Sequence, residues 1–215
     1  MTSPKKPRRK KPTKAIDDPW VTKFSVIDPA KLHALGVITA GWNSCEIHLI
    51  ALFVKVVNLE PHPAWIVAHD LGDIALSERI YELAKSRCEN GELDIDVVDG
   101  LKSLLKVYDL CRQNRNLFTH SKLEIGEDGT RRIVRMKGPS MIRHALPSDL
   151  SDFRRVAEEI SSLLHAIHLM WRAVEERNLG RRIPLPKIPP PPELLWKPHP
   201  ANSIGTKPQP PASRP

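Results

Sequence analysis

The spacing of apolar residues predicts a long helix near the start of the chain. Apolar side chains recur every three or four residues, which places them on one face of a helix. They are Leu32, Leu35, Ile38, Trp42, Cys45, Leu49, Leu52, Val56 and Leu59. Asp28 and Pro29 supply the start signal, because an aspartate can cap the first turn and proline fits the first helical position. Pro61 and Pro63 end the helix, since proline cannot continue it.

The helical period continues through most of the remaining chain. A short helix is expected over residues 64–70 and a longer one over 74–88, with Asn90-Gly91 as its stop signal. The next helix spans 95–118, and its apolar face comprises Val97, Leu101, Leu104, Tyr108 and Cys111. Ser148 is expected to cap a last helix that closes at Gly180. Its apolar residues are Leu150, Phe153, Val156, Ile160, Leu164, Ile167, Trp171 and Val174.

The pattern changes from helical to alternating between His120 and the last helix. Residues 122–125 and 131–136 flank Gly126-Glu127-Asp128-Gly129. Asp-Gly between two alternating segments is typical of a β-hairpin. The fold class predicted from these elements is all-α, a four-helix bundle with a small β-hairpin inserted before the last helix.

The charge of the chain divides it into a mildly acidic middle and two basic arms. The 215 residues carry a formal charge of +8, of which residues 1–14 contribute +7 and residues 180–215 contribute +5. Subtracting both leaves −4 for the middle. Twelve of the 21 prolines follow Gly180. We therefore expect a disordered basic arm over 1–20, a helical domain over 21–180, and a proline-rich, mostly disordered tail over 181–215.

The first arm is a candidate for binding nucleic acid. Its cations Lys5, Lys6, Arg8, Arg9, Lys10 and Lys11 can release counterions from phosphates. The same cluster would be a nuclear localisation signal in a eukaryote. A solubilising disordered tail is an equally good interpretation.

Composition argues against several classes of protein. The longest unbroken apolar run, residues 49–54, is far short of the roughly 20 residues that cross a bilayer, so we expect no membrane association. The charged N-terminus without an apolar stretch argues against a signal peptide. Cys45, Cys88 and Cys111 lack paired spacing, which favours a reduced, cytoplasmic setting. His165 and His168 share a helix face, but no third ligand has readable spacing, so we expect neither metal nor cofactor.

An arginine is predicted on the apolar face of the helix over 95–118. After Cys111 the next positions on that face are Arg115 and Phe118. Burying a guanidinium costs several kcal/mol unless an anion, a carboxylate or a cavity compensates it. One interpretation is an internal ion pair, for example with Glu46 on the first helix. The other is that Arg115 faces a cleft and binds phosphate, with Asn116 as a polar partner and His120 in proton transfer.

The segment Arg115-Asn116-Leu117-Phe118-Thr119-His120 resembles the motif of the HEPN superfamily. These helical bundles carry an arginine, often followed by Asn, and a histidine four to six residues after the arginine. The match lies at the end of the third long helix and is followed by one more helix, and the resemblance covers residues 29–179. The resemblance implies metal-independent RNA cleavage, with Arg115 on the scissile phosphate, Asn116 orienting the groups and His120 as general base or acid. It also implies a homodimer, and Glu46 is a candidate for the acidic residue that often joins the site.

Two functions therefore remain open. The first is a ribonuclease of toxin or defence type, with RNA as substrate and an antitoxin or another protein as partner. The second is a non-enzymatic helical binding or scaffold module, in which Arg115 and His120 are structural. Separately, Leu194-Leu195-Trp196 would expose apolar surface in a disordered tail, so we expect this segment to dock on the helices or on a partner.

Overall fold

The helices account for most of the structure. The computed structural model describes residues 28–125, 131–137, 142–146 and 149–195. Its helices are α2 (Pro29–Val57), α3 (Pro61–His69), α4 (Asp73–Glu89), α5 (Ile95–Thr119) and α6 (Leu150–Asn178). The prediction of a mostly helical chain is confirmed.

Most of the predicted start and stop signals act as expected, but the end of the first helix is a correction. α2 ends at Val57 with the left-handed Asn58 as its cap, and Pro61, predicted to end it, instead occupies the first turn of α3, where proline fits. Asp28 Oδ1 accepts a hydrogen bond of 2.8 Å from the backbone N–H of Ala30, and Pro29 occupies the first helical position of α2. Gly91 and Gly180 adopt φ of 74° and 71° just after α4 and α6. A left-handed residue at this position reverses the chain, and glycine adopts it without strain. Ser148 was expected to cap α6, but the N-cap residue is Asp149, directly before Leu150.

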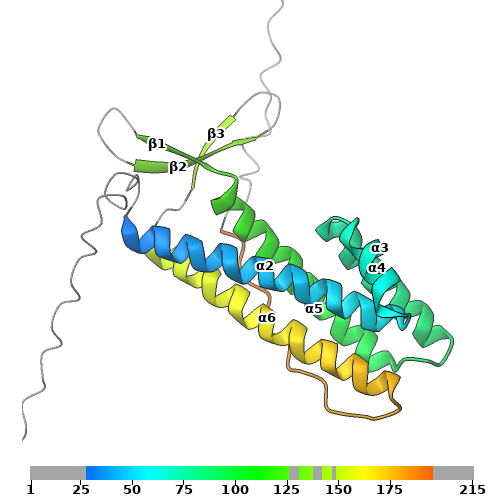
Figure 1. Cartoon of the computed structure of the whole chain (residues 1–215). Helices are drawn as coiled ribbons and strands as arrows, with labels where there is room; N and C mark the ends of the chain where they lie inside the picture. The colour runs from blue at the N-terminus through cyan, green and yellow to red at the C-terminus, as the bar shows by residue number, and fades with distance from the viewer. Residues whose placement is uncertain (1–27, 126–130, 138–141, 147–148, 196–215) are drawn as a thin grey trace, which may run out of the picture.

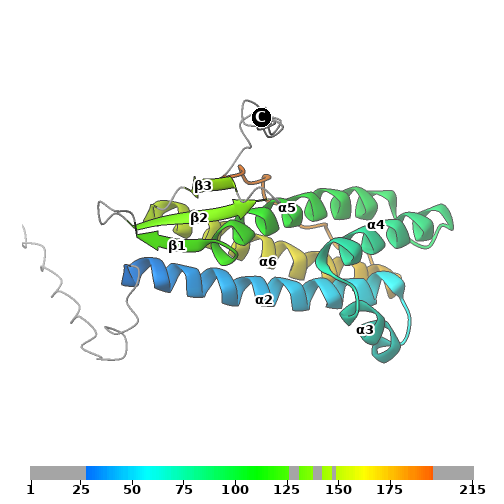
Figure 2. The ribbon, with the colours of Figure 1, turned by 90° about the horizontal axis from the view of Figure 1, so that it is seen from above.

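The three longest helices lie side by side along most of the molecule (Figures 1 and 2). α2 packs chiefly on α6 and runs in the same direction, because the ends of both helices meet where Asn178 Nδ2 donates to the carbonyl of Lys55 at 2.9 Å. α5 runs in the opposite direction, so that Phe118 at its end packs against Phe153 at the start of α6, with tilted rings whose centroids are 4.2 Å apart. The short α3 and the longer α4 pack against the C-terminal part of α2.

The core contains most of the residues predicted to lie on apolar faces. Ile38, Trp42, Cys45, Leu49, Leu52 and Val56 of α2 are 0 to 1% exposed. Leu32 and Leu59 are wrong predictions, because they are 37% and 66% exposed. Leu32 lies in the first turn of α2, and Leu59 follows the end of that helix, so neither is enclosed by neighbouring helices.

Among the described residues, α2 is long and apolar enough to cross a membrane, judged by length and composition alone. Our sequence criterion missed this because it counted only unbroken apolar runs. The core helix of a soluble protein passes the same test, as a signal sequence does. In this structure the apolar face of α2 packs against α4, α5 and α6.

Three strands lie between α5 and α6. They are β1 (Lys122–Ile125), β2 (Arg131–Lys137) and β3 (Ile142–Leu146). They form an antiparallel sheet of order β1-β2-β3, beside the end of α5 (Figure 2). The alternating pattern predicts β1 and β2, over residues 122–125 and 131–136, but not β3, whose residues lack clear alternation. The residues of the predicted turn, 126–130, are outside the described part of the chain.

The first half of the proline-rich tail is packed against the helices. Residues 181–195 follow an extended path, and Leu185, Ile188 and Leu195 contact the core. Residues 181–195 are therefore packed against the helices, whereas residues 196–215, which the expectation of a mostly disordered tail also covers, lie outside the described residues. Prolines restrict the unfolded chain, so ordering this segment costs less entropy, while its leucine and isoleucine side chains bury apolar surface. Trp196 lies outside the described residues.

Candidate functional site

Arg115 lies half-buried at the end of α5, against an aromatic ring. Its Cζ lies 5.8 Å from the centroid of the Trp42 ring, at the distance of a cation–π contact. Its Nη1 donates a hydrogen bond of 2.9 Å to Asn116 Oδ1. Its Nε is buried and has no hydrogen-bond partner among the described residues. Within the described ranges no carboxylate forms an ion pair with Arg115. The guanidinium is therefore only partly compensated by its surroundings.

The polar residue that α5 buries in the core is Asn114, not Arg115. Asn114 is 0% exposed, whereas Arg115 is half-buried. Our prediction placed Arg115 on the buried face, and this is corrected. A helical period of 3.6 residues puts both the third and the fourth residue after Cys111 near that face, so spacing alone could not choose between them.

The side chain of Asn114 holds the tail in place. Its Nδ2 donates to the carbonyl of Glu193 at 2.9 Å, and its Oδ1 accepts from the backbone N–H of Leu195 at 3.0 Å. A buried amide needs both kinds of partner, and the tail backbone supplies them. The sequence reasoning missed this residue, although a polar residue three positions after Cys111 on an apolar face was the available signal.

Glu46 does not pair with Arg115. Its Oε1 accepts a hydrogen bond of 2.5 Å from Trp42 Nε1 on the same helix. Trp42 also packs against Tyr108, with ring centroids 4.8 Å apart. The internal ion pair offered as the structural interpretation of Arg115 is thus absent, and Trp42 links Glu46 to the arginine instead.

His120 is exposed at the end of α5, where it is the C-terminal cap. Its backbone N–H donates to the carbonyl of Asn116 at 3.2 Å. Residues four apart lie on the same side of a helix, so Asn116 and His120 are neighbours along α5. Trp42 thus contacts both Glu46 and Arg115, and Arg115 in turn binds Asn116. His120 lies one turn beyond Asn116 and is exposed to solvent.

Two of the three cysteines, Cys45 and Cys111, are buried and unreactive. Burial, aided by the charge of Glu46, raises the pKa of Cys45 to about 12. Burial, with smaller effects of Glu159 and Cys45, raises the pKa of Cys111 to about 12. Both thiols stay protonated at neutral pH and act as small apolar groups. In the described part of the chain, no three His, Cys, Asp or Glu side chains gather as metal ligands would.

A cavity of about 200 Å³ lies between α5, α6 and the tail. Its lining includes Cys111, Arg155, Glu159 and Pro190. Burial raises the pKa of Glu159 above its usual range, and Arg155 and a hydrogen bond from Asn114 partly oppose this shift. One carboxylate oxygen of Glu159, Oε2, is buried and finds no hydrogen-bond partner within the described part of the chain. The tail therefore covers a polar group as well as apolar surface.

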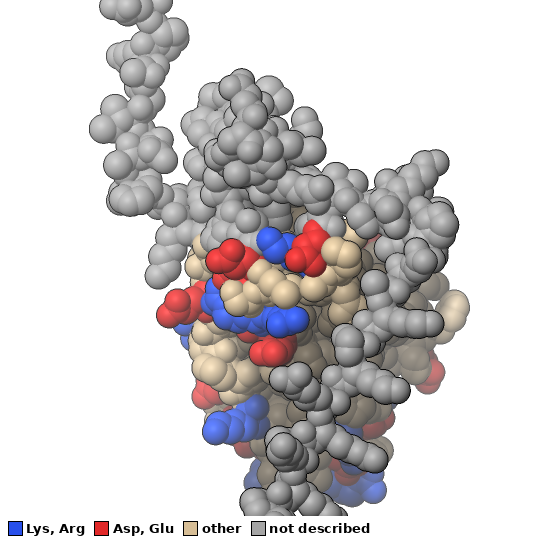
Figure 3. All heavy atoms as spheres, turned by 90° about the vertical axis from the view of Figure 1, so that its left-hand side faces the viewer, with Lys and Arg blue, Asp and Glu red and all other residues tan. Residues whose placement is uncertain are grey.

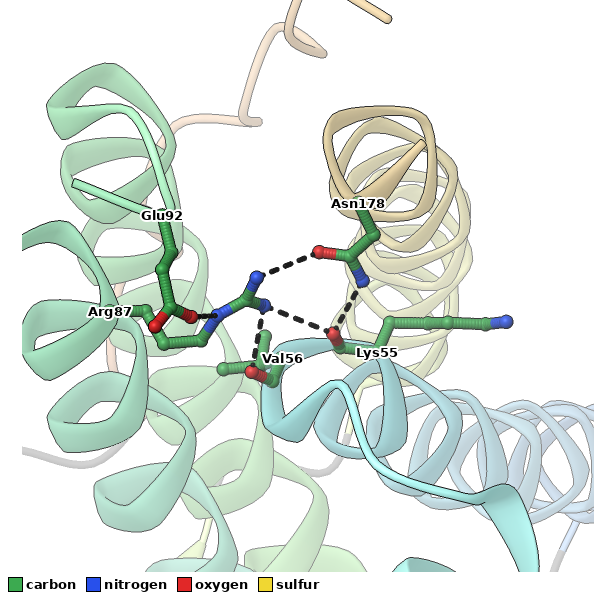
Figure 4. Close-up of polar contacts among 5 residues, drawn as sticks. All are labelled: Lys55, Val56, Arg87, Glu92 and Asn178. Atoms are coloured by element: carbon green, nitrogen blue, oxygen red, sulfur yellow. Dashed lines mark hydrogen bonds and ion pairs between the residues drawn. The ribbon is translucent and has the colours of Figure 1, made fainter. Parts of the chain in front are cut away.

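A separate polar cluster joins three helix ends at the opposite end of the molecule (Figure 4). Arg87 is only 9% exposed, and its Nη1 donates to the carbonyl of Val56 at 3.1 Å. Its Nη2 donates to Asn178 Oδ1 at 3.1 Å, and its Nε lies 3.1 Å from Glu92 Oε2. All three nitrogens of this guanidinium have acceptors, so the cluster connects α4 to the ends of α2 and α6 and stabilises the fold.

The six cations of the first arm, Lys5, Lys6, Arg8, Arg9, Lys10 and Lys11, lie outside the described residues. No protein-family model, curated protein or solved structure gives a significant match to this chain. A function must therefore be inferred from the chemistry of the site itself.

Proposed function

We propose that this protein is a metal-independent ribonuclease of HEPN type, with Arg115 on the scissile phosphate. The observation that carries the proposal is the state of this arginine. It is half-buried, has no carboxylate partner among the described residues, and keeps a buried Nε without an acceptor. Buried polar groups are nearly always hydrogen-bonded, and a guanidinium matches the geometry of phosphate oxygens. A bound phosphate would supply the missing acceptor.

The neighbouring residues fit roles in RNA cleavage. Asn116 fixes the guanidinium through its 2.9 Å hydrogen bond. Glu46 acts through Trp42, because it holds the indole against which Arg115 lies. His120, exposed at the end of α5, is free to meet the ribose of a bound RNA. An imidazole can accept or donate a proton near neutral pH.

In the proposed reaction, His120 of one copy removes the proton from the 2′-hydroxyl. The 2′-oxygen attacks phosphorus, and the bond to the 5′-oxygen breaks. His120 of the second copy in a homodimer gives a proton to that leaving oxygen. The products are a 2′,3′-cyclic phosphate and a 5′-hydroxyl. Arg115 stabilises the negative charge that develops on the phosphate oxygens.

We further propose that the helices form a HEPN-like four-helix bundle in which the strands are an insertion. The protein would act in the cytoplasm without a cofactor, and an antitoxin or another protein would control it. The cations of the first arm would add contacts to RNA phosphates that do not depend on sequence.

The test is RNA cleavage by the purified protein in EDTA. Arg115→Ala and His120→Ala should each lower the rate by at least about a hundredfold. Arg112→Ala is the matched control, because Arg112 lies on the same helix and pairs with Asp109 at 2.6 Å. Circular dichroism and thermal melting establish that the variants fold. Cleavage that survives in both variants, or none by the wild type across varied RNAs, would contradict the proposal.

The second candidate is a helical binding module without enzymatic activity. The observation that favours it is the contact of Asn114 with the tail, since α5 there binds an extended, proline-rich segment through its backbone. On this hypothesis Arg115→Ala and His120→Ala change stability alone, and the wild type cleaves no RNA.

A further inference from the structure

The cavity of about 200 Å³ between α5, α6 and the tail has apolar walls on two sides. α5 contributes the buried side chains of Val107 and Cys111. The tail contributes the rings of Pro189, Pro190 and Pro192, and α6 contributes the polar side. An apolar cavity of about 150 Å³ holds benzene, so this one has room for a six-membered ring with a short substituent.

The polar side of the cavity contains a carboxylate with an acceptor that lacks a donor. Oε2 of Glu159 is buried and makes no hydrogen bond to any described residue. Oε1 lies 3.8 Å from Nη1 of Arg155, too far for a hydrogen bond. Burial raises the pKa of Glu159, because the charged carboxylate is only partly compensated. A donor placed in the cavity would therefore be bound favourably.

The part of the tail that covers the cavity cannot supply this donor. Residues 189–192 are four consecutive prolines, and proline has a carbonyl acceptor but no N–H. Ile188 packs against the core before them, and the carbonyl of Glu193 accepts a hydrogen bond from Asn114 after them. The prolines are thus held at both ends and add acceptors and apolar rings to the cavity.

The charges around the cavity favour a cation. Among the described residues that line it, Arg155 is the single cation, against Glu158 and Glu159. Arg155 is also divided between two carboxylates, because its Nη2 lies 3.8 Å from Oδ1 of Asp152. Figure 3 views the end of the molecule at which α2 and α6 begin, where the described acidic and basic side chains are intermixed. No charge of one sign covers that end, so the preference for a cation comes from the cavity itself.

We propose that this cavity binds a small organic cation, a primary amine on an apolar ring, with its ammonium group on Glu159. An ammonium group has three donors and a positive charge, which match a carboxylate beside carbonyl acceptors. The ring would lie between Val107, Cys111 and the prolines, and proline side chains pack well against aromatic rings. The site does not include Arg115, and the inference holds whether or not the chain cleaves RNA.

The test uses the full chain and two probes of nearly the same shape. Benzylamine is a cation at neutral pH, and benzyl alcohol is neutral. Titrations followed by heteronuclear NMR of the labelled protein measure both affinities and locate the site. The amide signals of Cys111, Glu159, Ile188 and Glu193 should move, since the prolines have no N–H to observe. The wild type should bind benzylamine about tenfold more tightly than benzyl alcohol, because a hydrogen bond between charged groups is stronger than a neutral one.

The first variant, Glu159→Gln, should remove this preference and leave the affinity for benzyl alcohol unchanged, since glutamine keeps the shape but not the charge. Asp99→Asn is the matched control. It removes an exposed carboxylate of α5 that does not line the cavity, so the tenfold preference should remain. Equal loss of the preference in both variants would assign it to net charge and overturn the inference.

A second pair of variants covers the case in which Glu159→Gln does not fold. Ser162 is an exposed residue at the cavity, and Ser161 is its exposed neighbour outside the lining. Ser162→Phe should fill part of the cavity and weaken the binding of both probes, whereas Ser161→Phe should bind them like the wild type.

Four results would overturn the inference. They are equal affinities of the two probes for the wild type, no binding of benzylamine at about 10 mM, unchanged binding by Ser162→Phe, and amide shifts confined to residues away from the cavity.

Discussion

Replacing Arg87 by alanine should destabilise the protein more than most single substitutions. Arg87 is 9% exposed and connects α4 with the last turn of α2 and with the end of α6 (Figure 4). Its Nη1 contacts the carbonyl of Val56 at 3.1 Å and, more weakly, that of Lys55 at 3.5 Å. Its Nη2 donates to Asn178 at 3.1 Å. In Arg87→Ala these acceptors would have no charged donor.

The expected magnitude follows from the hydrogen bonds and the ion pair that Arg87 makes. A hydrogen bond from a charged donor contributes about 1.5–3 kcal/mol, and Arg87 makes two good ones, to Val56 and Asn178. The ion pair with Glu92 adds about 0–1 kcal/mol, since the Glu92 side chain is 55% exposed. Because such contributions are not additive, we expect the free energy of unfolding to fall by about 3–5 kcal/mol, as when one partner of a buried charged pair is removed. The melting temperature should fall by roughly 6–20 °C.

The assay is urea unfolding followed by circular dichroism, with Arg79→Ala as the control. Arg79 is an exposed residue of the same helix, so its replacement should change the free energy of unfolding by no more than about 0.5 kcal/mol. Arg87→Lys should fall between the wild type and alanine, because an ammonium keeps the charge but not the planar fork. A decrease below about 1 kcal/mol in Arg87→Ala would refute the reasoning, since the acceptors would then be satisfied without the arginine.

Two further predictions concern the tail and the cavity that it covers. Asn114→Ala should cost about 2–3 kcal/mol in urea unfolding, because it removes both hydrogen bonds to the tail. Truncation after Pro192 removes the same partners, so the double change should cost less than the sum, and simple additivity would show that Asn114 does not act through the tail. Burial raises the pKa of Glu159, so the folded state binds its proton more tightly than the unfolded state does. The stability contributed by protonated Glu159 is present below the usual carboxyl range and is lost as pH rises through the raised pKa. Glu159→Gln should remove this part of the pH dependence of urea unfolding and Glu158→Gln, at an exposed neighbour, should keep it; identical pH profiles would contradict the prediction.

Several helix boundaries were predictable because local chemistry determines them, although the end of α2 at Val57 and the start of α3 at Pro61 were not. The first residue of α2 follows from Asp28-Pro29, and the ends of α4 and α6 follow from Gly91 and Gly180. Each of these signals acts within one turn of the residue that carries it. The sequence alone is sufficient wherever the deciding contacts are this close along the chain.

The contacts of Asn114 and Arg87 could not be predicted, because their partners are distant and belong to the backbone. Asn114 meets the tail 79 and 81 residues later, and Arg87 meets the carbonyl of Val56 31 residues earlier. A carbonyl or an N–H is present at nearly every position, so no sequence pattern marks which one is used. The prediction that Arg115 lies on the buried face was wrong for a related reason. The helical period places both Asn114 and Arg115 near that face and does not choose between them.

Arg87 and Arg115 differ in how far their surroundings compensate the guanidinium, and this difference distinguishes a structural arginine from a candidate ligand-binding one. Arg87 and Arg115 are both at least half-buried, and burial makes each guanidinium require compensation. Arg87 has an acceptor for each nitrogen, from the ends of α2 and α6 and from the loop after α4, so nothing is left for a ligand. Within the described residues, Arg115 has the amide oxygen of Asn116, the face of Trp42 and an unpartnered Nε. The uncompensated part of its charge is what an external anion can satisfy, and Arg115 is therefore where a phosphate should be sought.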